Sequence, residues 1–263
     1  MITIILVVYK SDKKKLNKIL KAIGTKYNLI IVDNSLNYNF DLIKLPKRTK
    51  IIRSINNGNG SGINIALKNC KTKFAIYFDI DVEFKKNLIH NLIKYSKKIK
   101  KFSILIPGHG KYKSGSLPVK DYVGEASVMF INMSILKKIG FFDENFFLYF
   151  EELDILSRCK EKKITAYLLP SLEIRHSRAS SIRKSAKLDL LRAWHYMWSM
   201  FYFYKKNYSY FFAVKKTSHY IFKDLVVILI SILFLNYKII KFRFFRLFGI
   251  TSSMLGLNSF LRP

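Results

Sequence analysis

Residues 74–81 read FAIYFDID, five apolar or aromatic residues followed by two aspartates that flank one isoleucine. A short apolar run of this kind predicts a buried strand over residues 74–78, with the aspartates at its carboxyl end. Alternate residues of an extended segment point the same way, so Asp79 and Asp81 could share one hard cation such as Mg²⁺ or Mn²⁺. The alternative is that the two aspartates form a strand-end turn or cap a helix.

Apolar runs upstream of this segment, at residues 2–9, 28–32 and 50–55, each predict another strand. Helical spacing over residues 16–23 and 65–69 places helices between them. The first run has no basic segment and no small-residue cleavage site, so we expect a strand there and not a signal peptide. Downstream we expect strands over 103–107, 128–131 and 165–169 and helices over 88–99, 134–139 and 154–161.

This alternation predicts an α/β fold with a mostly parallel central sheet flanked by helices. Ligands of open α/β sheets bind beyond the carboxyl ends of the strands. The two aspartates therefore lie where a ligand is expected.

The composition narrows the class of protein. Half of the 263 residues are apolar and 15% are aromatic, which excludes a disordered chain. Two cysteines are too few for a disulfide framework or a cysteine-built zinc site. The net charge of +30, from 47 basic and 17 acidic residues, favours anionic partners such as nucleic acid, lipid headgroups or phosphorylated substrates. An AT-biased genome is an alternative source of the many lysines, but it does not explain why the acids cluster.

The largest acidic cluster lies in FFDENFFLYFEELDILSR, residues 141–158. Glu151 and Glu152 follow an aromatic stretch and are expected to open a helix. Capping of that helix is one interpretation, because its dipole favours carboxylates at the N-terminus. The other is a general base whose pKa is tuned by an aromatic pocket.

Two further segments are candidates for ligand contact. NNGNGSGIN, residues 56–64, is predicted to be a loop whose glycines let the backbone approach a phosphate or nucleobase, although such clusters are usually plain turns. It matches neither the dinucleotide fingerprint nor the P-loop. His176 follows a predicted strand and precedes a polar loop; a lone histidine is usually structural.

Beyond Ser181 the chain is basic and aromatic, with fourteen Lys or Arg and two acids between residues 183 and 262. Leu225 to Leu235 is almost wholly apolar but falls well short of the roughly 20 residues that span a bilayer. We expect an interfacial helix anchored by aromatic and basic residues, with a core helix or a spanning helix as alternatives. The predicted domains are therefore 1–181 and a membrane-associated helical extension over 182–263.

In order, the motifs resemble family 2 glycosyltransferases with the GT-A fold, closest to their rhamnosyltransferase-like branch. The resemblance covers residues 2–181 and rests on VDN (32–34), NNGNGSGIN (56–64), DID (79–81), GEAS (124–127), GFFDENFFLYFEELD (140–154) and RHSRASS (175–181).

The resemblance implies a role for each matching residue. Glu152 would be the catalytic base with Glu151 beside it, Asp81 and His176 would hold Mg²⁺ or Mn²⁺, and Ser180 or Ser181 would be the polar residues that follow. Gly124 and Ala126 would lie on the acceptor side. The nucleotide-sugar would contact Val7, Val8, Tyr9, Asp33, Asn56, Gly58, Gly60, Gly62, Asn64 and Asp79. The sequence departs from the family at Glu152, where Asp is common, and at Ile63, Ala66, Arg178 and Ala179.

The resemblance implies an inverting, metal-dependent hexosyl- or rhamnosyltransferase. It would move a sugar from a dTDP-rhamnose-like or UDP-sugar donor to a lipid-linked or cell-surface glycan acceptor, in polysaccharide biosynthesis of the cell envelope. We expect it in the cytoplasm, attached peripherally to the anionic inner face of the cell membrane. The alternatives are a basic nucleic-acid-binding protein, which the acidic cluster disfavours because it would repel phosphates, and an inactive GT-A partner subunit.

Overall fold

A computed structural model describes residues 2–41, 43–109, 117–177 and 185–263. The chain divides into two compact units. The first comprises residues 1–142 and 155–183, and the second comprises residues 143–154 and 184–263. The second unit thus contains the segment that leads into Glu151 and Glu152, in addition to the C-terminal residues that the sequence sets apart.

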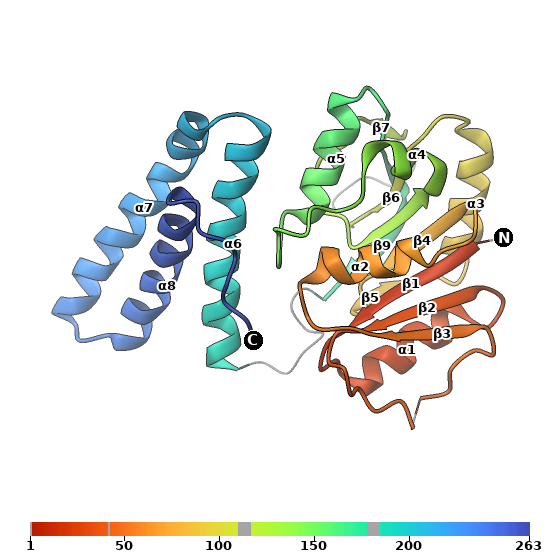
Figure 1. Ribbon diagram of the computed structural model, residues 1–263, viewed down its shortest axis with the longest axis horizontal. Helices are drawn as coiled ribbons and strands as arrows, with labels where there is room; N and C mark the ends of the chain where they lie inside the picture. The colour runs from red at the N-terminus through yellow and green to blue at the C-terminus, as the bar shows by residue number, and fades with distance from the viewer. Residues whose placement is uncertain (1, 42, 110–116, 178–184) are drawn as a thin grey trace. The chain divides into compact units, whose positions relative to one another are not determined.

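The first unit is built on one sheet with the strand order β3-β2-β1-β4-β8-β6-β9-β5, to which β7 adds by pairing with β9 (Figure 1). The strands are β1 (Ile2–Val8), β2 (Asn28–Asp33), β3 (Thr49–Arg53), β4 (Phe74–Phe78), β5 (Val82–Phe84), β6 (Ile104–Gly108), β7 (Val119–Lys120), β8 (Val128–Asn132) and β9 (Tyr167–His176). The helices are α1 (Lys13–Ile23), α2 (Asn59–Lys68), α3 (Leu88–Lys98), α4 (Met133–Ile139) and α5 (Glu151–Glu161), which begins in residues of the second unit.

Parallel pairing joins the N-terminal strands β3, β2, β1 and β4, and it also joins β6 to β9. β8 runs antiparallel to both β4 and β6, so the sheet is mixed beyond β4. The expected α/β architecture with a central sheet is confirmed. In the parallel half of the sheet, the carboxyl ends of β1, β2 and β4 form one edge, and this is the edge at which open α/β sheets bind ligands.

Helices cover both faces of the sheet because apolar side chains point alternately to either side. Ile4, Leu6 and Val8 of β1 pack with α1 and α3, whereas Ile5 packs with α2, α4 and α5 on the opposite face. Both sets are fully buried, as the continuous apolar sequence of β1 predicts.

The glycine-rich segment is less of a loop than its composition predicts, because α2 already begins at Asn59. Gly58 precedes the helix with a φ of 109°, a conformation that favours glycine. Gly62 lies inside the helix and packs directly on β1: a Cβ there would come within 2.8 Å of Val7 Cγ1 and 3.0 Å of Asn34 Nδ2. Close helix–strand packing therefore explains Gly62 without a ligand.

The strand predicted to stop before Pro170 continues through it to His176. Leu169 pairs with Pro107 and Glu173 pairs with Gly108, so the residues between them bulge out of the ladder. Proline is tolerated there because a bulge does not require its missing N–H. The expected end of the strand was wrong for this reason.

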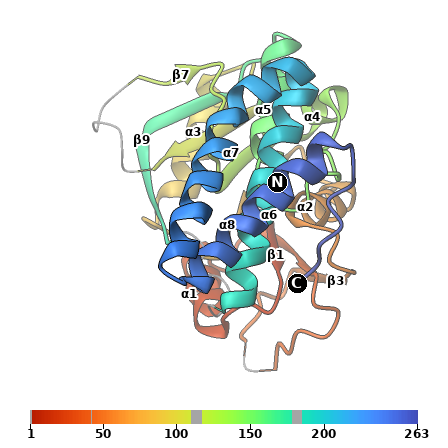
Figure 2. The same ribbon diagram turned by 90° about the vertical axis from the view of Figure 1, so that its left-hand side faces the viewer.

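The described part of the second unit contains the first turn of α5 and the helices α6 (Ala186–Asn207), α7 (Tyr210–Leu233) and α8 (Tyr237–Met254). The last three lie side by side in Figure 2. α6 and α8 approach so closely that a Cβ on Gly249 would lie 2.2 Å from the carbonyl oxygen of Trp194. The C-terminal residues fold back on α6, where Trp198 Nε1 donates to Leu257 O at 2.9 Å and His195 Nε2 bonds Leu261 O at 2.9 Å. Among the described residues, no helix combines the length and apolarity that crossing a membrane requires.

Candidate active site

Asp79, Asp81 and His176 form one cluster at the carboxyl end of β4. Each offers a ligand atom that lies within 4.8 Å of the other two. His176 Nε2 is 3.0 Å from Asp81 Oδ1 and 3.6 Å from Asp79 Oδ2. Asp81 is buried, while Asp79 and His176 are partly exposed, so the cluster opens toward solvent on one side.

Backbone pairing brings this cluster together from positions 95 residues apart. Asp81 directly precedes β5, and Val82 of β5 pairs with His176 of β9 in antiparallel register. The amide of Ser177 also donates to the carbonyl of Asp81 at 3.2 Å. β5 is only three residues long and no pattern in the sequence predicts it, so the sequence gives no geometric reason for this pairing.

The carboxylates around His176 control its protonation. Burial by itself lowers the pKa of this imidazole, but the hydrogen bond to Asp81 and the charges of Asp79, Asp81 and Glu125 together raise it above 6.5. Glu125 Oε1 lies 3.7 Å from Nδ1, on the other side of the ring. The imidazole is therefore held between carboxylates, and its Nε2 faces the two aspartates.

This donor set fits a divalent cation. Two carboxylates suit Mg²⁺ or Mn²⁺, and an imidazole nitrogen is compatible with Mn²⁺. The Tyr77 hydroxyl donates to Asp79 and also lies 3.2 Å from Asn59 Oδ1, which orients that carboxylate. Glu125 Oε1 lies at ion-pair distance from His176 Nδ1, 3.7 Å, which is longer than the hydrogen bond that usually orients a metal-bound histidine. Ser180 and Ser181 lie outside the described residues.

Residues at the ends of β1 and β2 have mainly structural contacts. Val8 is fully buried in the core, and Tyr9 is partly exposed beyond it. The buried Asp33 carboxylate accepts hydrogen bonds from the amides of Ser35 (2.8 Å) and Tyr38 (2.9 Å). Asn34 Oδ1 is buried and has no hydrogen-bond partner among the residues that the structure describes. Contact of Val8, Tyr9 and Asp33 with a nucleotide stays a prediction.

The residues of the glycine-rich segment that were predicted to contact the nucleotide also have mainly structural contacts. Asn56 Oδ1 accepts from the Gly58 amide at 3.2 Å, which shapes the turn into α2, and Gly60 is buried within the helix. The side-chain amide of Asn64 bonds both the carbonyl (2.9 Å) and the amide (3.0 Å) of Phe142. Asn64 thus ties α2 to the segment after α4.

On the predicted acceptor side, Gly124 packs against Tyr122, since a Cβ there would lie 2.5 Å from the tyrosine hydroxyl, and Ala126 is buried. The residue between them, Glu125, faces His176 and was not singled out from the sequence. Its only signal was its place in the GEAS motif.

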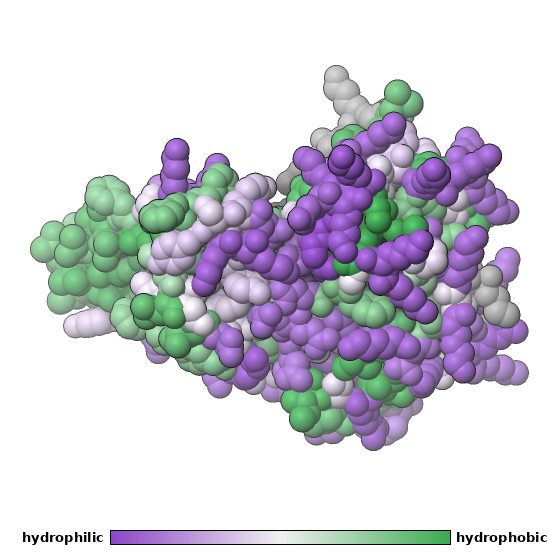
Figure 3. Space-filling view, turned by 45° about the horizontal axis from the view of Figure 1, so that its top comes forward, coloured by the Kyte–Doolittle hydropathy of each residue, from purple (hydrophilic) through white to green (hydrophobic). Residues whose placement is uncertain are grey.

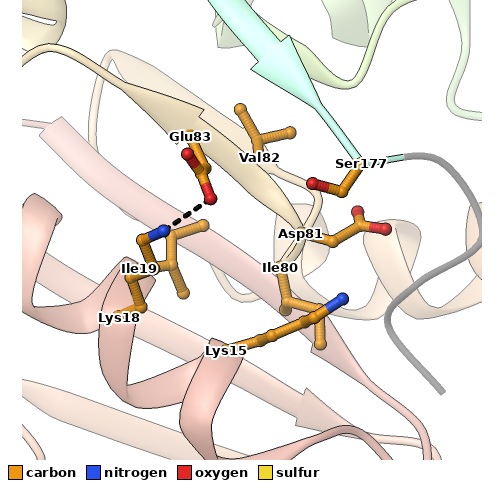
Figure 4. Close-up of a pocket in the computed structure, with 8 residues that line it drawn as sticks. All are labelled: Lys15, Lys18, Ile19, Ile80, Asp81, Val82, Glu83 and Ser177. Carbon is orange, nitrogen blue, oxygen red and sulfur yellow. Dashed lines mark hydrogen bonds and ion pairs between the residues drawn. The ribbon is translucent and has the colours of Figure 1, made fainter. Parts of the chain in front are cut away.

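A small pocket of about 30 Å³ lies between α1 and β5, and Asp81 is among its lining residues (Figure 4). Lys18 and Glu83 form an ion pair across it. This volume corresponds to about one water molecule. It is far below the 300–1,000 Å³ or so of typical small-molecule sites.

The candidate bases lie in the second unit, just after a strained turn. Tyr149 and Phe150 both have a φ of 68°, which bulky side chains rarely adopt. Ser199 of α6 holds this turn by donating to Leu148 O at 2.8 Å, and the Asp154 amide bonds Phe150 O at 2.9 Å. Glu151 is buried at the start of α5, whereas Glu152 is partly exposed. Of the two carboxylates, Glu152 is the more accessible to a substrate.

Lys206 of α6 joins both ends of this segment. Its ammonium lies 2.7 Å from Asp143 and 2.7 Å from Asp154, a fully buried carboxylate. Burial would raise the pKa of Asp143, but its bonds to Lys206 and Asn145 outweigh burial and lower it. Burial, with the charge of Asp143, raises the pKa of the bonded Tyr202 to about 12. Nothing in the sequence pattern identified Lys206, because it is one of many lysines.

The comparison with protein families gives one match. Residues 3–187 match the family described as glycosyl transferase family 2. No curated protein matches the chain significantly.

Three solved structures with similar folds are distant from this chain in sequence. GalNAc-T7 with UDP, GalNAc and Mn²⁺ has a TM-score of 0.58 at 13% identity, covering 84% of this chain and 57% of that one. The mannosyltransferase PcManGT from Pyrobaculum calidifontis, with GDP-Man and Mn²⁺, has a TM-score of 0.57 at 10% identity, covering 97% of this chain and 87% of that one. S. aureus TarS has a TM-score of 0.53 at 13% identity, covering 95% of this chain and 55% of that one. The chain thus spans little more than half of GalNAc-T7 and TarS, and the likeness establishes the fold.

The metal cluster predicts that the isolated protein binds Mn²⁺. Asp81→Asn should weaken this binding by at least about 100-fold, since changes to residues that merely orient a ligand already reach 10–100-fold. Calorimetry or the electron paramagnetic resonance of free Mn²⁺ measures it. Glu83→Gln, two residues away in an exposed ion pair, should bind as the unaltered protein does. Equal affinity of the unaltered and Asp81→Asn proteins would refute the cluster as a metal site.

The Lys206 contacts predict a large loss of stability on Lys206→Met. This change leaves the buried Asp154 without its cation. Breaking a pair that is buried on both sides costs about 3–5 kcal/mol, and because the Lys206 side chain is 29% exposed we expect a smaller loss here, at least about 2 kcal/mol. Urea unfolding followed by tryptophan fluorescence measures this loss of stability. The signal reports on the second unit, which contains Lys206, because both tryptophans, Trp194 and Trp198, lie there. Lys205→Met, at the exposed neighbouring position, is the control and should change stability by less than about 0.5 kcal/mol. Similar losses in the two variants would show that the ion pairs do not matter.

Proposed function

Because the chain belongs to glycosyltransferase family 2, we propose that it transfers a sugar, with inversion, from a nucleoside-diphospho-sugar to an acceptor hydroxyl. The observation that carries the proposal is the Asp79, Asp81 and His176 cluster at the carboxyl end of β4. A transferase of this kind must stabilise the negative charge that develops on the departing diphosphate. Carboxylates and an imidazole at the ligand edge of an α/β sheet are suited to holding the cation that does so.

In this proposal Asp81 and His176 hold Mg²⁺ or Mn²⁺, with Asp79 at the same cluster. When bound, the cation acts as a Lewis acid toward the diphosphate. The Tyr77 hydroxyl orients Asp79 by a hydrogen bond, and the charge of Glu125 lies on the far side of the His176 ring. The hydrogen bond fixes the Asp79 carboxylate before the donor arrives, which limits the reorganisation needed during transfer.

Glu152 is the proposed general base. The acceptor oxygen attacks the anomeric carbon, its proton passes to the Glu152 carboxylate, and the bond from that carbon to the diphosphate oxygen breaks with its electron pair on the leaving group. A single displacement of this kind inverts the anomeric centre and needs no protein nucleophile. Partial exposure suits Glu152 to this role better than the buried Glu151.

The donor is proposed as a nucleoside-diphospho-sugar because GalNAc-T7 was solved with UDP and PcManGT with GDP-Man. A dTDP-rhamnose-like donor or a UDP-sugar, and membership of the rhamnosyltransferase-like branch, are the finer proposals. The acceptor is proposed as a lipid-linked or cell-surface glycan of the cell envelope.

We also propose that the chain binds peripherally to the anionic inner face of the cell membrane. Residues 183–262 carry fourteen basic side chains against two acids, and each basic residue near an anionic surface contributes about 1 kcal/mol. Attachment there would bring the active site to a lipid-linked acceptor.

The proposed base predicts the kinetics of Glu152→Gln. Glutamine keeps the shape but cannot accept a proton, so we expect turnover to fall at least about 100-fold with donor affinity retained. A panel of nucleotide-sugars, with Mn²⁺, Mg²⁺ or EDTA, first identifies the donor, and release of the nucleoside diphosphate then measures turnover. Glu151→Gln is the matched variant; if it is the inactive one, the base is assigned one residue too late.

Membrane attachment predicts that the protein co-sediments with vesicles of phosphatidylcholine and phosphatidylglycerol. Binding should weaken as salt rises, because the Debye length falls from about 10 Å at 0.1 M to about 3 Å at 1 M. Alkaline carbonate should release much of the bound protein. Complete resistance to both treatments would contradict peripheral attachment.

A further inference from the structure

The hairpin formed by α7 and α8 ends in a group of exposed apolar side chains. Leu233 is 81% exposed and Phe234, in the turn that follows, is 78% exposed. We call this end of the hairpin the tip; its exposed members are Leu229, Ile230, Ile232, Leu233, Phe234, Leu235 and Tyr237. Figure 3 shows the apolar surface at the left of the view. Contiguous apolar patches of this kind mark interaction sites in proteins.

The exposed charged residues that border the tip are all basic. The sequence contains no charged residue from Leu225 to Tyr237, and the exposed Lys223, Lys238 and Lys241 flank that stretch. Asp224 is the only acid of the hairpin, and it is fully buried. The tip therefore presents an apolar end with a basic border, which complements an anionic lipid surface.

Buried ion pairs hold the hairpin closed just behind the tip. Arg243 and Arg246 of α8 each contact a different oxygen of Asp224 on α7 at 2.7 Å. The turn itself is capped by Asn236, whose side chain accepts from the Ile239 amide at 3.2 Å. The apolar residues are thus presented on a braced element, so ordering them on binding loses little entropy.

The dimensions fit insertion into one leaflet. Residues 225–235 extend about 16 Å at 1.5 Å per residue, roughly half of a hydrocarbon core about 30 Å thick. Lys238 and Lys241 start one and four residues after Tyr237, so their ammonium groups must extend back to the phosphates. They limit entry of the tip to the outer 5–10 Å or so of the acyl layer.

We propose that the tip of the α7–α8 hairpin inserts end-on into one leaflet of an anionic bilayer, with Lys223, Lys238 and Lys241 at the headgroups. This rests on the proposed membrane attachment and differs from a helix that lies flat along its whole length. The alternative is that the tip packs against a second copy of the chain.

Two variants of α7 test the proposal with the full-length protein. Leu233→Asp alters the tip, and Phe211→Asp makes the same change in charge at the opposite end of the helix, where Phe211 is 84% exposed. Flotation with 3:1 phosphatidylcholine and phosphatidylglycerol vesicles measures the partition coefficient. We expect Leu233→Asp to lower it at least about 30-fold, since it places a charge in the acyl layer. Phe211→Asp should lower it no more than about fivefold, the effect of one surface charge.

Thermal unfolding of both variants must match that of the unaltered chain, and an environment-sensitive dye on Phe234→Cys provides a reading independent of stability. Quenching of this dye by brominated acyl chains, with none for a dye on Phe211→Cys, supports the inference. Binding with equal losses for the two Asp variants, or with an unquenched dye at residue 234, overturns end-on insertion and leaves peripheral attachment standing. No binding of the unaltered chain overturns both. A lipid-free dimer that Leu233→Asp dissociates, combined with an unquenched dye at residue 234, assigns the tip to a second copy.

Discussion

The antiparallel pairing of β5 with β9 is the constraint on which the candidate metal site depends. Asp79 and Asp81 are fixed by the end of β4, but a cluster with His176 exists only because Val82 pairs with that residue. β9 reaches this pairing only beyond the bulge at Pro170, after which Glu173 still pairs with Gly108 of β6. The bulge therefore links the core of the sheet to the chemistry at its edge.

Buried charge organises the second unit. Lys206 neutralises Asp143 and Asp154 at the two ends of the segment that contains the strained turn. Contacts between α6 and this segment, including the Ser199 bond to Leu148, support the backbone from which Glu151 and Glu152 project. α6 thus supports the backbone segment that carries the candidate base.

The buried acidic residues of this basic chain have specific partners that its amino-acid composition does not explain. The buried acids among the described residues are Asp33, Asp81, Glu151, Asp154 and Asp224. Asp33 accepts backbone amides, Asp81 belongs to the metal cluster, and Asp154 and Asp224 pair with Lys206 and with two arginines. A genome bias toward lysine can raise the surface charge, but it does not place carboxylates in buried sites, where they destabilise the protein unless paired.

The α/β architecture could be predicted from the sequence alone, because the continuous apolar run of a buried strand and the periodicity of a helix are both local patterns. It also identified Asp79, Asp81 and His176 as candidates, the first two from their place after β4 and all three through the family resemblance. The tertiary structure decided what those patterns do not encode. Gly62 allows α2 to pack closely on β1, and Asn64 hydrogen-bonds the backbone of Phe142. Lys206 pairs with Asp143 and Asp154, at the two ends of the segment that contains Glu152, and the apolar run after Asp224 includes the exposed end of a hairpin. Each of these depends on contacts between residues far apart in the chain, and the same local sequence is compatible with several such partners.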